Sequence, residues 1–373
     1  MRHILRQLAL TALFFGGLYA AVLGIALIVM PNPPSDGSLD LETSDATPYL
    51  TPTKYVFLAR DILDIPDRKV LLLGASNTGV GFRLGSVQAL VSCAKVSNLA
   101  IGSANISEVR QLIDLVHEVQ DDAARRSNTF VIGVWFGMFA DTERRWPGAD
   151  RHHGDTDLDV ERYRYGFYRR TASGPVAVLP PEWLRAGVVL IRPYLLLEMV
   201  ARKATIAFRR TVLGRPATLS DDEREAIVVS DKEKSDALAY WRQNMGGTSE
   251  ISQAQAALLQ DTIDGLLRSG EKVVLADLPI PSWHRDASVY QPGYARTMQK
   301  IFDHFANRPG FEGLRMADLD ADQDYSDEVH PKPHLARVWA SRLAGVLNPL
   351  VCPARTAADP EGTLQERFAP AAE

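Results

Sequence analysis

The segment that most constrains the fold is residues 69–83, KVLLLGASNTGVGFR, whose pattern is typical of a buried strand, a tight turn and a helix start. Residues 70–73 form a continuous apolar run, as expected of a parallel strand covered on both faces. Gly74 lets the chain turn, and Ser76 lies in the turn. A serine there is exposed where open α/β sheets bind ligands, close to helix N–H groups that stabilise an oxyanion. The alternative is an ordinary strand–helix loop with a helix-capping serine.

The alternation of apolar runs and helical periodicity extends this pattern along the chain. It predicts an α/β fold, a three-layer sandwich with a central parallel sheet, because such alternation places helices on both faces of a sheet. A large insertion, residues 137–247, interrupts the alternation after the third strand. The predicted strands are 70–73, 94–101, 129–136, 272–278 and 313–319, and the main predicted helices are 106–122, 194–211, 220–228, 252–269, 294–307 and 335–347.

The N-terminal region carries a second strong signal. Residues 8–30 contain no charged side chain, are long enough to cross a bilayer, and follow Arg2 and Arg6. The positive-inside rule then predicts an uncleaved, single-pass inner-membrane anchor with the remaining chain in the periplasm. A cleaved signal peptide is the competing interpretation. The predicted organisation is an anchor (1–30), a linker (31–52), one domain (53–350) and a disordered tail (351–373).

Charge and cysteine content narrow the function classes. The net charge of −5 argues against a general nucleic-acid binder. The two cysteines, Cys93 and Cys352, are far apart in sequence. An oxidising compartment permits a disulfide, but the sequence does not establish the pairing, and a small buried thiol is the commoner fate of a residue such as Cys93.

A late polar segment, residues 320–334, contains Asp327 and His330 three positions apart. Nucleophilic serine catalysis needs a base that takes the hydroxyl proton and a carboxylate that holds this base in the right tautomer. An Asp-x-x-His turn supplies both groups from one loop. Each residue alone is typical of a surface loop, and it is their combination with Ser76 that indicates chemistry.

These segments together resemble the SGNH (GDSL-type) hydrolase superfamily. The resemblance rests on residues 74–78 (GASNT), on Asn98 with the later Gly102-Ser103 turn, and on residues 327–330 (DEVH). With the N-terminal anchor, the chain is most similar to the membrane-anchored extracytoplasmic branch, which includes alginate O-acetylation proteins and the D-alanyl transfer protein of teichoic acid synthesis. The resemblance implies Ser76 as nucleophile, His330 as base and Asp327 as its orienting acid. It also implies oxyanion donors at the Ser76 N–H and at Gly102 or Ser103.

The chain departs from the family pattern at two places. Ala75 replaces the Asp of Gly-Asp-Ser, and the third block, residues 134–139 (VWFGMF), lacks the usual Asn that donates to the oxyanion. Either another side chain completes the oxyanion hole or two backbone donors suffice. Losing one donor costs about 3 kcal/mol in other enzymes.

Other segments suggest weaker candidates. Trp283 and His284 follow a predicted strand and are expected to line the cleft, with Trp135 as a third substrate-binding candidate. The tract 163–170, YRYGFYRR, either grips a sugar polymer or supplies core aromatics in a helix or hairpin. Glu328 and His334 are expected to face solvent. No cofactor and no metal site is expected, because the polar cluster His152, His153, Asp155, Asp157 and Asp159 lacks a recognised ligand spacing.

The predicted function is a periplasmic serine acyltransferase or esterase that O-acetylates an exopolysaccharide or cell-wall glycan through a Ser76 acyl-enzyme. By analogy with the anchored branch, a membrane partner would deliver the acyl group. The alternatives are a carbohydrate O-acetylesterase and a non-catalytic glycan-binding subunit of a polysaccharide assembly or export complex. The acyl group, the acceptor and the oligomeric state do not follow from the sequence.

Overall fold

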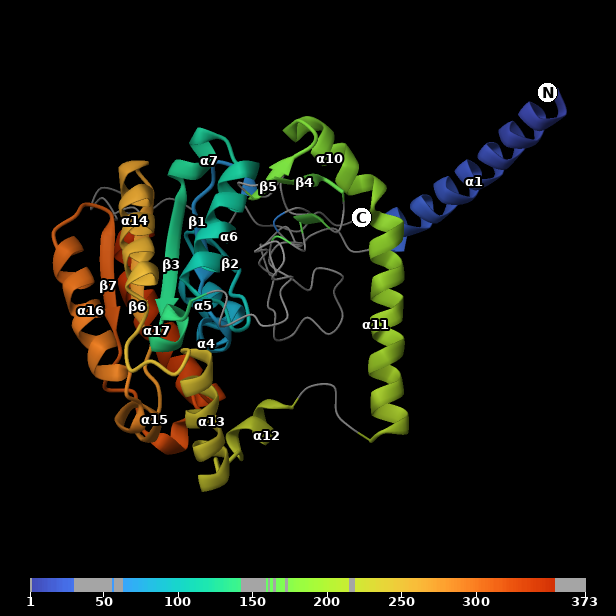
Figure 1. Ribbon diagram of the computed structural model, residues 1–373. Helices are drawn as coiled ribbons and strands as arrows, with labels where there is room; N and C mark the ends of the chain where they lie inside the picture. The colour runs from blue at the N-terminus through green and yellow to red at the C-terminus, as the bar shows by residue number, and fades with distance from the viewer. Residues whose placement is uncertain are drawn as a thin grey trace, which may run out of the picture.

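The computed structural model describes residues 2–29, 56, 63–141, 159, 162–163, 166–171, 174–214 and 219–352. The predicted linker (31–52), most of the predicted tail and the polar cluster His152, His153, Asp155 and Asp157 lie outside these ranges. Figure 1 shows the arrangement of the described helices and strands.

A five-stranded parallel sheet forms the centre of the molecule, with strand order β2-β1-β3-β6-β7. All five predicted strands are confirmed, with ends that differ by up to four residues. Four of the five predicted C-terminal ends were too late because apolar residues after the strands, such as Leu99 and Trp135, are buried in loops outside the strands. The strands are β1 (Lys69–Leu73), β2 (Lys95–Asn98), β3 (Asn128–Val134), β6 (Lys272–Asp277) and β7 (Phe311–Arg315).

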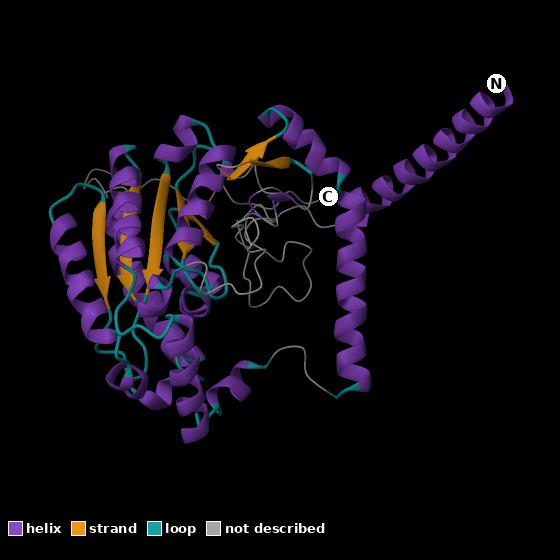
Figure 2. Cartoon of the chain, in the orientation of Figure 1, coloured by secondary structure: helices purple, strands orange, loops and turns teal. Residues whose placement is uncertain are grey.

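Both faces of the sheet are buried, which explains why its strands are continuously apolar. Alternate residues of β1 divide between two cores: Leu71 and Leu73 join one, and Val70 and Leu72 join the other. The first core is closed by α6 (Ile106–Val119), α14 (Gln253–Arg268) and α16 (Gln291–Phe305), and the second by α5 (Leu84–Leu90) and α17 (Pro333–Val351). Figure 2 shows the strands enclosed between these helices.

Helix α6 ends three residues earlier than predicted, and a short helix α7 (Asp122–Arg126) follows it. Gln120 is extended, and its side chain donates to the Leu63 carbonyl (2.6 Å). Asp121 then caps the new helix by accepting from the Ala124 N–H at 2.7 Å. The buried Gln120 amide therefore binds partners outside the helix, and α6 ends before the apolar periodicity does.

The segment after β3 leaves the sheet, as the predicted insertion requires. Its described part contains η2 (Phe136–Phe139), β4 (Tyr168–Thr171), β5 (Gly174–Ala177), α10 (Pro181–Leu190), α11 (Arg192–Val212), α12 (Asp221–Glu225) and α13 (Asp231–Asn244). Strands β4 and β5 form an antiparallel hairpin that buries Phe167 and Tyr168. These two aromatic residues of the YRYGFYRR tract therefore belong to the core.

Helix α1 (Arg2–Val29) projects away from the sheet (Figure 2). In the described part of the chain it is the one helix long and apolar enough to cross a membrane. Near its C-terminal end it contacts α11, where Ala26 packs with Leu195 and Met199.

A disulfide joins Cys93 and Cys352, which are 259 positions apart in sequence. The expectation of a buried thiol at Cys93 was therefore wrong. The bridge connects the segment before β2 to the end of α17, which the sequence could not show because only the packing of α17 beside α5 brings the two residues together.

Candidate active site

Ser76 is the first residue of the short helix α4 (Ser76–Gly81), directly beyond the carboxyl end of β1. Gly74 makes the turn with a φ of 148°, a conformation that strains other residues. A Cβ at Gly74 would lie 2.1 Å from Thr78 Oγ1, and one at Gly133 would lie 2.4 Å from it. Two glycines therefore make room for the buried Thr78, whose hydroxyl donates to the Gly133 carbonyl at 3.4 Å and ties α4 to β3.

The loop between β7 and α17 holds Asp327 and His330 in a compact turn. Asp327 Oδ1 accepts from the backbone N–H of Val329 (2.9 Å) and of His330 (2.8 Å). The Ser326 N–H donates to the His330 carbonyl at 3.0 Å, and Tyr325 forms an isolated bridge with Pro331. Backbone hydrogen bonds therefore fix the two side chains before any substrate arrives.

A continuous hydrogen-bond chain connects the two ends of the domain at this point. His330 Nδ1 lies 2.6 Å from Asp327 Oδ2, and His330 Nε2 lies 2.7 Å from Ser76 Oγ. Partial burial raises the pKa of Asp327, but the hydrogen bond and charge of His330 and the two backbone N–H groups together hold it below its usual value. The ionised carboxylate only accepts, so Nδ1–H donates to it and leaves the Nε2 lone pair to accept the Ser76 proton.

The loop after β2 brings the second predicted block beside the nucleophile. The Ile101 N–H donates to the Gly74 carbonyl at 2.9 Å. Asn98 is fully buried and donates from its amide to the Gly79 carbonyl at 3.1 Å, which attaches the end of β2 to α4. Gly102 and Ser103 follow as exposed residues, and Ser103 has a positive φ of 62°. Neither the Ser76 nor the Gly102 N–H donates to any described residue.

The third block offers no asparagine, but several buried side-chain N–H groups lack an acceptor among the described residues, and two of them are candidates for the missing donor. They are Asn77 Nδ2, next to the nucleophile, and Trp135 Nε1, directly after β3. Asn77 is fully buried, and its Oδ1 accepts from the Thr78 N–H at 3.0 Å. Asn77 was not among the predicted site residues, although its position beside the candidate nucleophile was a usable signal.

His284 is not placed to act as a second base. It is fully buried, its Nδ1–H donates to the Glu328 carbonyl at 2.8 Å, and burial lowers its pKa to about 4. Helix α15 (Ser282–Ala287), which is not among the predicted helices, carries it. His284 packs beside Trp135 and Phe136 and supports the backbone next to Asp327.

Two residues expected to face solvent have partners instead. Glu328 accepts from Trp241 Nε1 at 3.3 Å, and burial, with the nearby charge of Asp327, raises its pKa. His334 binds Glu225 through Nδ1 (2.6 Å) and lies 3.2 Å from Asp324 through Nε2. Helix α12 of the insertion is thus attached to the start of α17. Sequence reasoning missed both contacts because the partners come from a distant segment.

A groove of about 350 Å³ opens beside Asp327. Trp283 and Tyr240 supply aromatic surface, and Lys234 Nζ lies 5.9 Å from the centre of the Trp283 ring. Trp283, one of the residues predicted to line the cleft, is in the lining of this groove. The lining residues are Val229, Glu233, Asp236, Ala237, Tyr240, Trp283, Ser326, Asp327 and Glu328.

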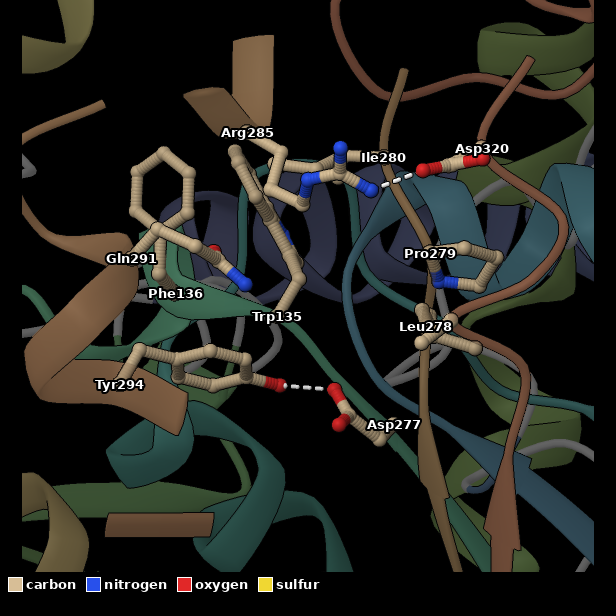
Figure 3. Close-up of a pocket in the computed structure, with 11 residues that line it drawn as sticks. Trp135, Phe136, Asp277, Leu278, Pro279, Ile280, Arg285, Gln291, Tyr294 and Asp320 are labelled. Carbon is tan, nitrogen blue, oxygen red and sulfur yellow. Dashed lines mark hydrogen bonds and ion pairs between the residues drawn. The ribbon is translucent and has the colours of Figure 1, made fainter. Parts of the chain in front are cut away.

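A smaller cavity of about 50 Å³ lies beyond the ends of β3 and β6, with Trp135 in its wall (Figure 3). Tyr294 Oη donates to Asp277 Oδ1 at 2.6 Å inside it, and Arg285 pairs with Asp320 at its edge. Burial raises the pKa of Asp277 to about 6, although the Tyr294 hydrogen bond and the charge of Arg315 oppose the shift. The cavity has room for only a few water molecules.

No group of metal-ligating side chains occurs among the residues that the structure describes. Asp159, from the polar cluster considered above, is buried, and its Oδ1 lies 3.9 Å from Arg162 Nη1. The candidate site residues are Ser76, His330 and Asp327, with the Ser76 and Gly102 N–H groups and Asn77 Nδ2 as candidate donors. Comparison with known proteins adds no relative, since no family model and no curated protein sequence matches the chain.

Proposed function

We propose that this chain is a membrane-anchored serine acyltransferase or esterase with the three-layer α/β/α architecture of the SGNH hydrolases. The observation that carries the proposal is the hydrogen-bond chain from Ser76 through His330 to Asp327. Two segments far apart in the sequence meet in it, and a binding protein has no need of that arrangement. Ser76 remains partly exposed, so an acyl donor can reach it.

The proposed reaction has two halves. Ser76 Oγ attacks the carbonyl carbon of an ester while His330 Nε2 takes the hydroxyl proton. The oxyanion accepts from the Ser76 and Gly102 N–H groups, with Asn77 Nδ2 as the third donor. His330 then protonates the leaving alkoxide, which departs and leaves an acyl-Ser76. In the second half His330 deprotonates an incoming hydroxyl, which attacks the acyl carbon; the Ser76–acyl bond then breaks, and His330 returns the proton to Ser76 Oγ.

The groove beside Asp327 is the proposed acceptor site. Aromatic rings such as those of Tyr240 and Trp283 pack well against sugar faces. The carboxyl groups of Glu233, Asp236 and Glu328 surround these rings and repel polyanions. A neutral or amine-bearing glycan hydroxyl is therefore favoured as acceptor over a polyuronate. Water as acceptor gives the esterase reaction with the same residues.

Two features support a location outside the cytoplasm. Helix α1 follows the positive-inside pattern, with Arg2 and Arg6 at its N-terminal end. Disulfides such as Cys93–Cys352 persist in oxidising compartments. A periplasmic domain on a single-pass inner-membrane anchor fits both features. Acyl transfer there requires a membrane partner that supplies the acyl group.

The test uses the full chain in detergent micelles, incubated with p-nitrophenyl acetate and analysed by intact-mass spectrometry. We expect an acetyl adduct on Ser76 in the wild-type protein and none in Ser76→Ala. In His330→Ala, the adduct accumulates without turnover only if the first half-reaction proceeds without the histidine. Adding neutral, amine-bearing or uronate oligosaccharides then shows which acceptor removes the acetyl group.

An alternative from another class is a non-catalytic glycan-binding subunit, supported by the absent third-block Asn. A fluorophosphonate probe separates the two. Labelling of Ser76 that requires His330 supports the enzyme. Unlabelled wild-type protein that still binds glycans would reject it.

A further inference from the structure

The corner between α10 and α11 lies against the membrane-spanning candidate α1. Tyr19 Oη donates to the Leu190 carbonyl, and Ala26 is buried against Leu195 and Met199. Figure 1 shows α1 meeting α11 near the end that follows α10. The corner is therefore packed directly on the helix that is long and apolar enough to span a membrane.

The contacts on α1 locate the corner relative to a bilayer. Tyr19 precedes the end of α1 at Val29 by ten residues, which is about 15 Å of helix at 1.5 Å per residue. The hydrocarbon core of a bilayer is about 30 Å thick. If α1 spans the bilayer, the corner lies along its outer half and cannot face water on all sides.

The exposed surface of the corner is apolar, as that position requires. Leu190, Leu197 and Val200 are 53%, 66% and 54% exposed, and Phe208 further along α11 is 55% exposed. At 100° per residue, Leu197, Val200 and Phe208 share one side of α11, away from the side of Leu195 and Met199 that packs on α1. Trp183 on α10 is 67% exposed as well.

The charge of α11 matches a lipid surface. The helix carries five basic residues and one acidic residue, Glu198; the basic residues are Arg192, Arg202, Lys203, Arg209 and Arg210. Lys203, Arg209 and Arg210 lie in the half of the helix farther from α10. Basic amphipathic helices with aromatic and aliphatic residues on the apolar side lie in the interface of anionic bilayers, and each Lys or Arg adds to the attraction.

We propose that the α10–α11 corner is a second membrane contact of this chain, lying in the outer leaflet beside α1 and binding anionic headgroups through the basic end of α11. The proposal concerns lipid and requires no catalytic activity, but it rests on α1 spanning the membrane. It gives the insertion a role: the corner holds the sheet domain at a fixed distance from the bilayer.

The disulfide makes a labelling test simple, because Cys93 and Cys352 are paired and no free cysteine occurs among the described residues. Leu197→Cys, Phe208→Cys and the control Val228→Cys, which is 86% exposed between α12 and α13, each receive a nitroxide. The full chain is placed in nanodiscs of phosphatidylcholine with phosphatidylglycerol. Collision of the label with oxygen and with a water-soluble nickel complex reports membrane depth.

We expect labels at 197 and 208 to collide several-fold more with oxygen than with nickel, and the label at 228 to show the reverse. Equal access of nickel to all three labels would overturn the proposal. This result is expected if α11 is covered by a protein partner, absent from the nanodisc sample, rather than by lipid. In Lys203→Gln/Arg209→Gln/Arg210→Gln, the oxygen preference at 208 should fall; an unchanged preference would overturn the role of the basic residues. Fluorophosphonate labelling of Ser76 in the same samples reports the catalytic site separately.

Discussion

Two aspartates at the carboxyl edge of one sheet have opposite properties. Asp327 sits in a loop after β7, accepts two backbone N–H groups and the His330 ring, and has a lowered pKa. Asp277 ends β6, accepts from Tyr294, and has a pKa raised to about 6. The difference follows from the number of donors: three donors and the charge of His330 favour the Asp327 anion, whereas Asp277 has one side-chain donor and burial dominates its pKa.

The two aspartates belong to a candidate reactive region and a supporting region. The candidate reactive region gathers polar donors around the partly exposed Ser76 at the end of β1. The supporting region lies beyond β3 and β6, where Trp135 and Phe136 line a small cavity and pack on His284, and where burial shifts the pKa values of Asp277 and His284 toward their neutral forms. We therefore expect substitutions in the first region to change rate and those in the second to change stability.

The largest expected effect separates the two aspartates directly. Asp327→Asn should lower ester turnover about 10⁴-fold, because a neutral amide no longer fixes the His330 tautomer. Asp277→Asn should leave turnover within about 3-fold, since Asp277 contacts Tyr294 and not the triad. Initial rates with p-nitrophenyl acetate measure both, and circular dichroism checks that both variants fold. Equal losses in the two variants would end the distinction between the regions.

The next prediction compares two candidate oxyanion donors, Asn77 in the candidate reactive region and Trp135 in the supporting region. Asn77→Ala should lower turnover about 10²-fold, the usual cost of one donor, while Trp135→Phe keeps most activity. The ratio of kcat to KM for a small ester is the readout, with melting temperature as the control for folding. A large loss only in Trp135→Phe would move the third donor to the end of β3.

The pH dependence of stability tests the supporting region. The pKa of Asp277 is raised, so its stabilising contribution is present below its ordinary 3.8 and is lost as the pH rises through about 6. The pKa of His284 is lowered, so its contribution is present above 6.5 and is lost as the pH falls through about 4. The two trends oppose each other between pH 4 and 6.

Removing either group should expose the other trend. In Asp277→Asn, the free energy of unfolding should fall on acidification from pH 6.5 to 4, by on the order of 3 kcal/mol. In His284→Asn it should rise over that range. Urea unfolding at several pH values gives the slopes, which matter here more than the absolute stabilities. Parallel slopes in both variants and wild type would show that neither group titrates as described.

The smallest effect belongs to an exposed carboxylate. Asp221 in α12 accepts twice from Arg83 Nη1, at 2.9 and 2.8 Å, and the hydrogen bond from Arg83 lowers its pKa. Its side chain is 57% exposed. Asp221→Asn should cost less than about 1 kcal/mol of unfolding free energy, and the loss should shrink in high salt. The fully exposed Asp231 serves as the matched control in Asp231→Asn. A loss above 2 kcal/mol would contradict the surface-pair estimate.

The local sequence pattern predicted most of the sheet but not the contacts that the insertion makes with it. Residues 70–73 and 272–278 were identified as strands because both faces of a parallel sheet exclude water, which leaves a continuous apolar run. Helix α15 was missed because its six residues are too few to show helical periodicity. Glu328 and His334 were expected to face solvent, since no local signal shows that Trp241 and Glu225 approach them.

The sequence by itself determined the parallel α/β sheet, the apolar N-terminal helix and the candidate identities of Ser76, Asp327 and His330. These depend on apolar periodicity and on residue types at strand ends, which are local properties. Only the tertiary structure decided that Ser76 and His330, 254 positions apart, come within 2.7 Å, that Cys93 pairs with Cys352, and that α11 packs on α1. Such contacts depend on how helices pack across the sheet, and side-chain geometry over that distance is not encoded in any short stretch of the chain.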